Sequence, residues 1–271
     1  MSLINIINVN HRAGDRVLFQ NVSFSIQKQD RIALVGANGC GKSTLLEILM
    51  GEKSTDGQII RQQNLHIIWL KQFIPINLLP LSPQALLRTR HRLETKYTEQ
   101  YNVTAEQYEK IIGLCALTHQ QCQRPLADFS GGQQNQLLLA HACVIQPDLI
   151  LMDEPSNYLD LPTMIQFENM INQILKGAIL IVSHDEEFIE NTTHQTLFLH
   201  NQTMHHFDLR YQQAAIALQQ AEDALRQRSQ TQMKTITRLE KRANELKRWG
   251  RDFDNPKLSK KAKSMETRIE K

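Results

Sequence analysis

A glycine-rich stretch carries the clearest chemistry in this sequence. Residues 36–44 read Gly-Ala-Asn-Gly-Cys-Gly-Lys-Ser-Thr. Glycines at this spacing let the backbone turn with its N–H groups pointing inward, so that Lys42 can reach the outer phosphates of a ligand and Ser43 can hold Mg²⁺. The stretch therefore predicts a phosphate-binding loop, and the alternative is a glycine-rich turn that happens to contain a lysine.

Polar side chains also follow two runs that read as buried strands. Asp153 and Glu154 come directly after the apolar run 149–152, and His184 follows the apolar run 178–183. Runs that are apolar on both faces are typical of central parallel strands. Adjacent carboxylates at the carboxyl end of such a strand are costly unless they serve a cation or a reaction, so this pair is a candidate metal or catalytic site.

The elements around these residues fit that chemistry. A strand predicted at 31–35 precedes the glycine-rich loop, and a helix predicted at 44–50 follows it, which is the context that a phosphate-binding loop requires. A strand-like run at 65–70 brings Gln72 to a strand end, where its side chain can face the same site.

A Ser-Gly-Gly-Gln motif at 130–133 precedes a helix predicted at 135–145. Ser130 is a predicted N-cap, and the two glycines expose the N-terminus of that helix. Without a ligand in front of it, the same motif is simply a capped helix after a turn.

The other elements are predicted from hydrophobic periodicity and turn residues. We expect a small β layer before the phosphate-binding loop, inserted helices in the middle of the chain, and two short strands at the end of the core. Strands are predicted at 3–9, 17–19, 22–26, 58–60, 196–200 and 203–207, and helices at 83–96, 105–117 and 162–175. The fold class is therefore α/β.

The C-terminal region differs in composition from the core. From Tyr211 onward the chain has no Pro or Gly until Gly250, which predicts one long helix. The seam of Ile236, Leu239, Ala243 and Leu246 and the later seam of Leu258, Ala262, Met265 and Ile269 predict an antiparallel helical hairpin that is incomplete at residue 271.

This C-terminal region also holds the positive charge. It has 15 Lys/Arg and 8 Asp/Glu, a net charge of +7, which leaves −4 for the rest of the chain because the whole sequence has a net charge of +3. A basic helical region indicates either a nucleic-acid partner or a solvated lysine-rich helix.

Composition excludes several classes of protein. With 41% hydrophobic residues the chain can bury a sizeable core. It has no signal-like N-terminus and no apolar run of the roughly 20 residues that span a bilayer, so we expect a soluble, cytoplasmic protein without a membrane segment. The cysteines show no paired spacing typical of zinc or disulfide sites, and they stand at Cys40, Cys115, Cys122 and Cys143.

The ordered motifs resemble the ATP-binding cassette (ABC) ATPases over about residues 1–208. Within that superfamily, the Asp-Glu-Pro-Ser-Asn-Tyr-Leu-Asp block at 153–160 resembles the corresponding block of the ABC-F proteins, and the basic hairpin resembles their interdomain linker. ABC-F proteins join two cassettes in one chain, have no membrane domain and act mostly on the ribosome, where the linker reaches towards the P-site transfer RNA.

The resemblance implies a role for each motif. Glu154 is the expected general base, Gln72 senses the metal and the attacking water, and His184 contacts the γ-phosphate. Mg²⁺ is expected at Ser43, Asp153 and Gln72. The residues expected to bind ATP are Gly36, Asn38, Gly39, Cys40, Gly41, Lys42, Ser43, Thr44, Ser130, Gly131, Gly132, Gln133 and Asp160.

In this family the Ser-Gly-Gly-Gln motif completes the site whose phosphate-binding loop lies on the other cassette. Hydrolysis therefore implies a second cassette, from the same native chain or from a homodimer. The implied domains are a P-loop ABC cassette at 1–208, with an antiparallel β subdomain and a helical subdomain at about 75–145, and a linker hairpin at 209–271. The native chain is expected to continue beyond residue 271.

The sequence also departs from the family pattern. Gln136 and His141 stand where these cassettes usually carry arginines, and no aromatic residue near Ala13 is available to stack on adenine. Two other functions therefore stay open. One is the nucleotide-binding subunit of an ABC transporter, and the other is a weakly hydrolysing, ABC-derived regulator that binds nucleic acid.

The tip of the predicted hairpin combines cations with aromatic residues. Trp249 and Phe253 either stack on a base or close the hairpin. The cations that could meet an RNA backbone are Lys241, Arg242, Lys247, Arg248, Arg251, Lys257, Lys260 and Lys261.

Overall fold

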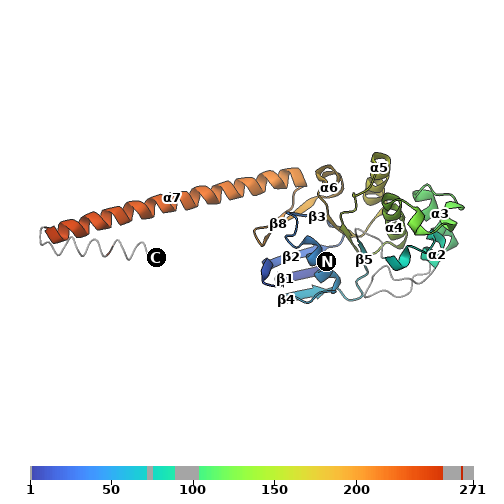
Figure 1. The fold of residues 1–271 in the computed structure, drawn as a ribbon, viewed down its shortest axis with the longest axis horizontal. Helices are drawn as coiled ribbons and strands as arrows, with labels where there is room; N and C mark the ends of the chain where they lie inside the picture. Colours follow the sequence, from blue (N-terminus) through green and yellow to red (C-terminus); the bar gives the residue numbers. More distant parts are fainter. Residues whose placement is uncertain (1, 72–75, 89–103, 253–263, 265–271) are drawn as a thin grey trace. The chain divides into compact units, whose positions relative to one another are not determined.

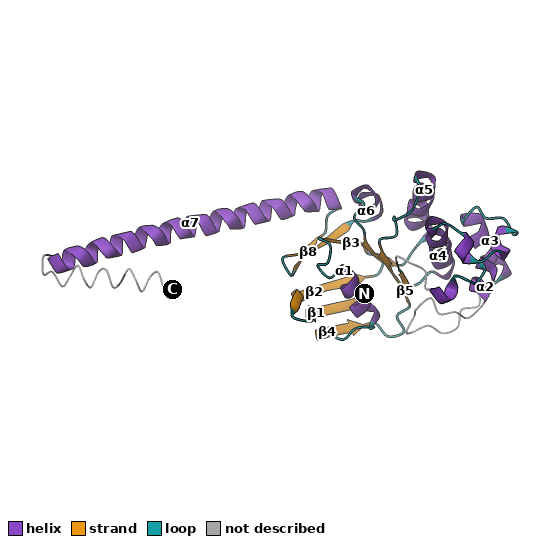
Figure 2. Cartoon of the chain, viewed as in Figure 1, coloured by secondary structure: helices purple, strands orange, loops and turns teal. Residues whose placement is uncertain are grey.

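The structure is a computed structural model, and it describes residues 2–71, 76–88, 104–252 and 264. The chain forms two compact units, Met1–Ala214 and Ala215–Lys271. Strands and helices alternate through most of the first unit (Figures 1 and 2), which confirms the α/β class expected from the sequence.

The core is a sheet with the strand order β5-β6-β7-β3-β8-β9. All neighbouring pairs are parallel except the pair that β9 makes with β8. The carboxyl ends of the central strands therefore meet at one edge, where the predicted site residues follow them. The strands are β3 (Arg31–Gly36), β5 (Ile67–Leu70), β6 (Leu149–Asp153), β7 (Ala178–Val182), β8 (Gln195–His200) and β9 (Thr203–Phe207).

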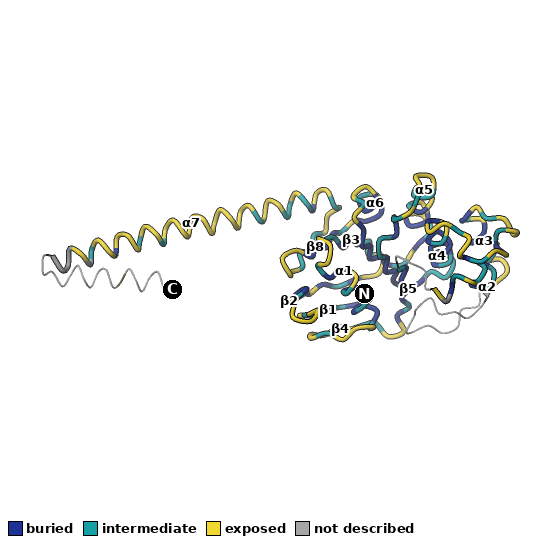
Figure 3. Tube along the Cα trace, viewed as in Figure 1, coloured by how far each residue is buried: buried dark blue, intermediate teal, exposed yellow. Residues whose placement is uncertain are grey.

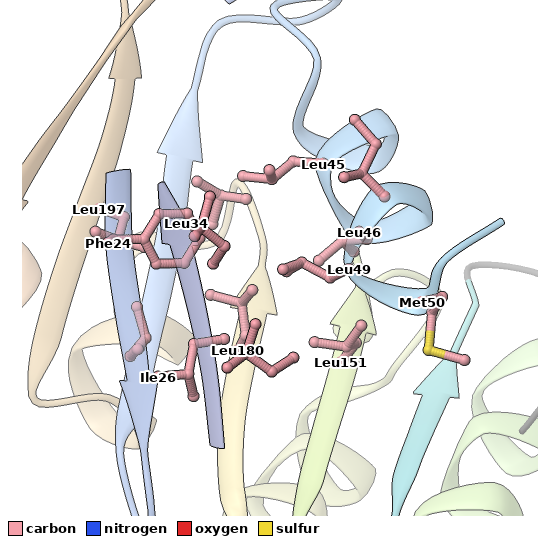
Figure 4. Packing of buried hydrophobic residues seen from close by; sticks show 14 of the residues in the cluster. Phe24, Ile26, Leu34, Leu45, Leu46, Leu49, Met50, Leu151, Leu180 and Leu197 are labelled. Carbon is pink, nitrogen blue, oxygen red and sulfur yellow. The ribbon is translucent and has the colours of Figure 1, made fainter. Parts of the chain in front are cut away.

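Helix α1 (Lys42–Met50) packs on this sheet and fixes the loop before it. In Figure 4, Leu45, Leu46 and Leu49 of α1 point towards the sheet, which carries Leu34, Leu151 and Leu180. These leucine side chains are fully buried, and burying one is worth about 1.5–3 kcal/mol. The predicted start of the helix at residue 44 was two residues late, because Lys42 and Ser43 already belong to the first turn.

A three-stranded antiparallel sheet packs into the same hydrophobic cluster as α1. Its order is β2-β1-β4, with β1 (Ser2–Ala13), β2 (Arg16–Gln27) and β4 (Asp56–Arg61). The prediction of two separate strands at 17–19 and 22–26 is wrong. They form one strand, because Asn21 takes a φ of 51° and absorbs a register shift without ending the strand.

A group of helices lies at one end of the first unit (Figure 1). The helices are α2 (Pro83–Arg88), α3 (Ala105–Leu114), α4 (Gly131–Ile145) and α5 (Leu161–Asn169), with a π-helical turn at Met170–Ile174 and 3₁₀ turns at Ile76–Leu78, Gln121–Gln123 and Leu126–Asp128. The end of the helix predicted at 83–96 falls outside the described residues. The helix predicted at 105–117 ends earlier, because Ala116 takes a φ of 51°.

Two helix boundaries show how capping decides where a helix begins. Helix α4 begins at Gly131 instead of 135, because Ser130 and Gln133 form a reciprocal capping box directly before it. Helix α6 (Glu186–Thr192) was not predicted. Its N-cap is Asp185, whose side chain accepts a hydrogen bond from the N–H of Phe188 at 3.0 Å.

Helix α7 (Tyr211–Asp252) confirms the long C-terminal helix. Most of its residues are exposed (Figure 3). The second helix of the predicted hairpin lies outside the described residues, as do Phe253 and the cations beyond it. Within the described ranges, no helix is long and apolar enough to cross a membrane.

Candidate nucleotide-binding site

A cavity of about 430 Å³ opens where the ends of β3, β6 and β7 meet. It gathers residues from the glycine-rich loop, the carboxylate pair and the histidine that follows β7. Its lining consists of Leu18, Asn38, Gly39, Gly41, Lys42, Ser43, Thr44, Asp153, Glu154, Asn157, Val182 and His184. The three motifs that are far apart in the sequence therefore converge on one cavity.

The loop before α1 needs glycine at two of its positions. Gly39 and Gly41 have φ values of 71° and 110°, a backbone conformation that side-chain-bearing residues rarely adopt. A Cβ on Gly41 would also lie 3.1 Å from the ring of Phe19 and 3.2 Å from Leu18. The backbone can therefore pass close to the β layer and wrap a ligand, as a phosphate-binding loop requires.

Lys42 places its ammonium group inside this loop. The residue is only 7% exposed, and Nζ donates to the carbonyl oxygen of Gly36 at 2.7 Å. Nζ also lies 3.2 Å from the carbonyl oxygen of Ala37 and 3.4 Å from Nε2 of His184. A buried ammonium held by neutral carbonyls lacks a full counter-charge in these contacts, so the site fits an anion such as a phosphate group.

Asp153 and Ser43 offer oxygen atoms beside Lys42. Burial raises the pKa of Asp153, while a hydrogen bond from Ser43 and the charge of Lys42 act in the opposite direction. Carboxylate and hydroxyl oxygens are the ligands that Mg²⁺ prefers, and Mg²⁺ usually keeps several waters and binds through one carboxylate and the substrate phosphates. The donor set therefore fits a magnesium ion bound together with phosphate.

Glu154 is held in a strained conformation against His184. Its φ is 52°, and its backbone N–H donates to the carbonyl oxygen of Val182 at 2.8 Å. One carboxylate oxygen accepts a bond from the His184 N–H at 3.2 Å, and the other lies 3.4 Å from His184 Nε2. Burial is the main cause that raises the pKa of Glu154. A partly buried carboxylate with a raised pKa is suited to taking a proton.

The Ser-Gly-Gly-Gln motif lies at the N-terminus of α4 and does not line this cavity. Ser130 Oγ accepts from the Gln133 N–H at 3.2 Å, and Gln133 Oε1 accepts from the Ser130 N–H at 3.1 Å. A Cβ on Gly132 would lie 2.8 Å from the carbonyl oxygen of Tyr158, so this turn packs tightly against the loop that precedes α5.

Asp160 is a helix cap in this structure. Its Oδ1 accepts from the Thr163 N–H at 3.0 Å, and the hydrogen bonds with Thr163 lower the pKa of the Asp160 carboxyl group. Like Gly36 and Cys40 of the loop, it is absent from the cavity lining. Gln72 lies outside the described residues.

Sequence reasoning missed three residues of the lining. Leu18 comes from β2, and no local pattern singles it out from the other apolar residues of that strand. The sequence indicates Val182 only as one residue of a buried strand. Asn157 follows Asp153 and Glu154 by a few residues, and this closeness to the carboxylate pair in the sequence is the signal that could have identified it.

The residues that replace the family arginines lie within α4. Gln136 is 4% exposed, and its Nε2 donates to Oε1 of Gln166 on α5 at 2.6 Å. Burial, together with the neighbouring His66, lowers the pKa of His141 to about 4. Both side chains therefore serve the helical packing and lie outside the cavity lining.

Comparison with known sequences gives the family. The family model described as ABC transporter matches residues 19–157. The chain is 35% identical over 192 residues to the ATP-binding protein Uup of Buchnera aphidicola and 30% identical over 198 residues to the ribosome protection protein VmlR of Bacillus subtilis. These matches cover 70% and 73% of this chain but 31% and 34% of the relatives, so the chain spans about a third of their length.

A shorter relative is matched over most of its length. The chain is 32% identical over 207 residues to the zinc import ATP-binding protein ZnuC of Hydrogenovibrio crunogenus, which is 73% of this chain and 78% of that protein.

Solved structures agree with the fold. An ATP-binding subunit of an ABC transporter superposes with a TM-score of 0.63 at 21% identity, covering 76% of this chain and 91% of that one. A nucleotide-free ATP-binding cassette superposes with a TM-score of 0.62 at 20% identity, covering 81% of this chain and 96% of that one. With its phosphate-binding loop, its carboxylate pair and these matches, the chain belongs to the ABC transporter family and is an ATP-binding cassette of the ATPase class.

Proposed function

We propose that this cassette hydrolyses ATP as one half of a composite site completed by a second cassette. The convergence of Lys42, Asp153, Glu154 and His184 on one cavity carries the proposal. Lys42 and the loop backbone bind the β- and γ-phosphates and offset their negative charge. Ser43 and Asp153 would hold Mg²⁺, as the family resemblance also implies for Gln72, and the ion would supply electrophilic stabilisation of the phosphate oxygens.

The contact between Glu154 and His184 supports a division of labour at the γ-phosphate. Glu154 positions the attacking water and takes its proton, and its burial supports this because a raised pKa strengthens a carboxylate as a base. His184 is half exposed at the cavity and near Lys42, so it can turn towards the γ-phosphate. Water attacks the γ-phosphorus, the bond to ADP breaks, and inorganic phosphate leaves.

The position of the Ser-Gly-Gly-Gln motif supports the need for a second cassette. Ser130, Gly131 and Gln133 are exposed at the N-terminus of α4, and this terminus carries a partial positive charge that favours phosphate. Because these residues do not line the chain's own cavity, we assign them to the nucleotide on the partner cassette, together with Asp160. ATP then joins two cassettes, and hydrolysis releases them.

We further propose that the chain is an ABC-F type protein in which this switch acts on the ribosome. Three observations support it: the 153–160 block, the similarity to the ribosome protection protein VmlR, and the basic region after the cassette. The proposed organisation is a cassette at 1–208, with its helical subdomain at about 75–145, followed by a linker at 209–271 in a cytoplasmic protein.

The linker is the proposed RNA contact. Within the described part of α7, Lys241, Arg242 and Arg248 are exposed. Neutralising Lys241 and Arg242 with glutamine should reduce the salt dependence of RNA binding by a slope of about 2, because each lost phosphate contact lowers it by about 1. Binding measured over a salt series tests this, and an unchanged slope would leave these cations as solvated surface.

A transporter subunit is the second candidate, favoured by the match to 78% of ZnuC. Ribosome co-sedimentation of the Glu154→Gln protein at its native length, with ATP, separates the two candidates. We expect ATP-dependent co-sedimentation, because the variant binds ATP without releasing the closed state. Lys42→Ala in the same protein is the control and should abolish co-sedimentation. If Glu154→Gln binds ATP but stays in the supernatant, the ribosomal proposal is wrong.

A further inference from the structure

The first turn of α7 is bound to α6, the short helix that follows His184 (Figure 1). The Tyr211 hydroxyl donates to Oε1 of Glu186 at 2.7 Å, and the backbone N–H of Gln212 donates to Oε2 of Glu190 at 3.0 Å. The ring of Tyr211 lies 6.1 Å from that of Phe198 on β8. All of these residues belong to the compact unit Met1–Ala214, so the turn is an integral part of the cassette.

The other end of α6 reaches the nucleotide cavity. Asp185 caps the helix, and its own N–H donates to Ser183 Oγ at 3.1 Å. Directly before it, His184 contacts Glu154 and Lys42. Only Asp185 separates His184 from Glu186, the residue that accepts the Tyr211 hydroxyl.

Two adjacent residues near the middle of α6 hold this helix against the core. Phe188 and Ile189 are each 1% exposed, and the Phe188 ring lies 6.1 Å from that of Phe167. The two residues that precede them in α6, Glu186 and Glu187, are exposed. Burial and the neighbouring Glu186 raise the pKa of Tyr211 to about 12, so its hydroxyl remains a donor at neutral pH. The bond from Tyr211 therefore adds a second side-chain contact at the start of α6, beside the cap that Asp185 makes.

We infer that Tyr211 is a positioning residue for His184: through Glu186 it fixes the first turn of α6 and so the place of His184 in the nucleotide cavity. The inference rests on the proposed role of His184 at the γ-phosphate. Since linkage is reciprocal, a partner that moves the start of α7 changes the affinity for ATP, and ATP changes the affinity for that partner.

The test compares ATP with ADP, because only ATP carries the γ-phosphate that His184 contacts. Calorimetry on the full chain should show that Tyr211→Phe, which keeps the ring, lowers the affinity for ATP about threefold to tenfold while leaving the affinity for ADP unchanged. Glu186→Ala should lower the ATP affinity by the same factor, and the double variant should lose no more affinity than either single variant. Glu186→Gln should keep the ATP affinity, because glutamine keeps the acceptor oxygen.

Two controls decide how a failure is read. Glu187→Ala removes the adjacent exposed carboxylate and should leave the ratio of ATP to ADP affinity unchanged. His184→Ala should lower that ratio at least as much as Tyr211→Phe. If the ratio of ATP to ADP affinity is normal in Tyr211→Phe but lowered in His184→Ala, the positioning role of Tyr211 is wrong and the role of His184 stands. If the ratio is normal in both of these variants, the proposed role of His184 is wrong as well. If Glu187→Ala lowers the ratio as much as Tyr211→Phe does, the effect comes from a general weakening of α6, and the positioning role is wrong.

Discussion

The nucleotide cavity and the N-terminal turns of α4 and α5 hold the two groups of predicted ATP contacts, and they are built differently. In the cavity, Lys42, Glu154 and His184 follow three separate strands, and His184 contacts both of the others. In the helix turns, the side chains of Ser130 and Asp160 accept bonds from N–H groups of the helices that they cap. The cavity therefore offers phosphate contacts within one chain, whereas under the proposed function the turns contact the nucleotide of a partner cassette.

The largest effect should come from the ammonium group in the cavity. Lys42→Ala should lower the affinity for ATP about 100-fold or more, because the charge-assisted contacts to the outer phosphates are lost. Calorimetry with MgATP measures this directly. If the variant binds ATP with normal affinity, the cavity is not the phosphate site and the comparison between the two regions fails.

Glu154→Gln should separate binding from chemistry within the cavity. It keeps the side-chain shape but removes the base, so ATP turnover should fall about 10²–10⁴-fold while ATP affinity stays within about twofold of the original chain. Steady-state phosphate release, measured on the protein together with its partner cassette, tests this. Turnover at the normal rate would remove Glu154 from the catalytic role.

Substitution of Asp153 should show that this residue lowers the stability of the nucleotide-free protein, as expected for a group that serves a ligand. Burial raises its pKa in the folded state, so the folded protein loses stability as the pH rises from the unfolded value of 3.8 through the raised one. Asp153→Asn removes that loss at pH 7 and should raise the Tm of the nucleotide-free protein by a few degrees, since about 1 kcal/mol corresponds to about 2–4 °C in a domain of this size.

The gain in Tm from Asp153→Asn should shrink as the pH is lowered, because the aspartate becomes protonated. Thermal melts at several pH values measure it, and Mg²⁺-dependent ATP binding should weaken in the same variant. A lower Tm at pH 7 in Asp153→Asn would show that its contacts with Ser43 and Lys42 outweigh its burial.

The smallest effect should come from the cap of α5. Asp160→Ala should lower the folding stability slightly, and Asp160→Asn much less, because asparagine also caps helices well. Neither should change ATP affinity in the chain without its partner. Urea unfolding and calorimetry on both variants test this, and weaker ATP binding by Asp160→Asn would place Asp160 in the chain's own site.

The two regions also differ in how much of them the sequence predicts. The phosphate-binding loop and the buried strands are local patterns, so the sequence alone is enough to place Gly36–Ser43, Asp153 and His184. Leu18 reaches the cavity only through the packing of β2 on the loop, and α6 begins at a cap after a strand that ends without a glycine or proline. Contacts between distant elements, such as Tyr211 with Glu186, leave no trace in a single sequence.

One pair of titrations tests the central claim, that the chain binds ATP in its own cavity and offers the Ser-Gly-Gly-Gln turn to a partner. MgATP is titrated by calorimetry into Ser130→Ala and Lys42→Ala, and turnover is measured with the second cassette present. We predict that Ser130→Ala binds MgATP within about twofold of the original chain but loses turnover, whereas Lys42→Ala loses binding. Equal loss of MgATP binding in both variants would contradict the claim, because Ser130 would then belong to the same site as Lys42.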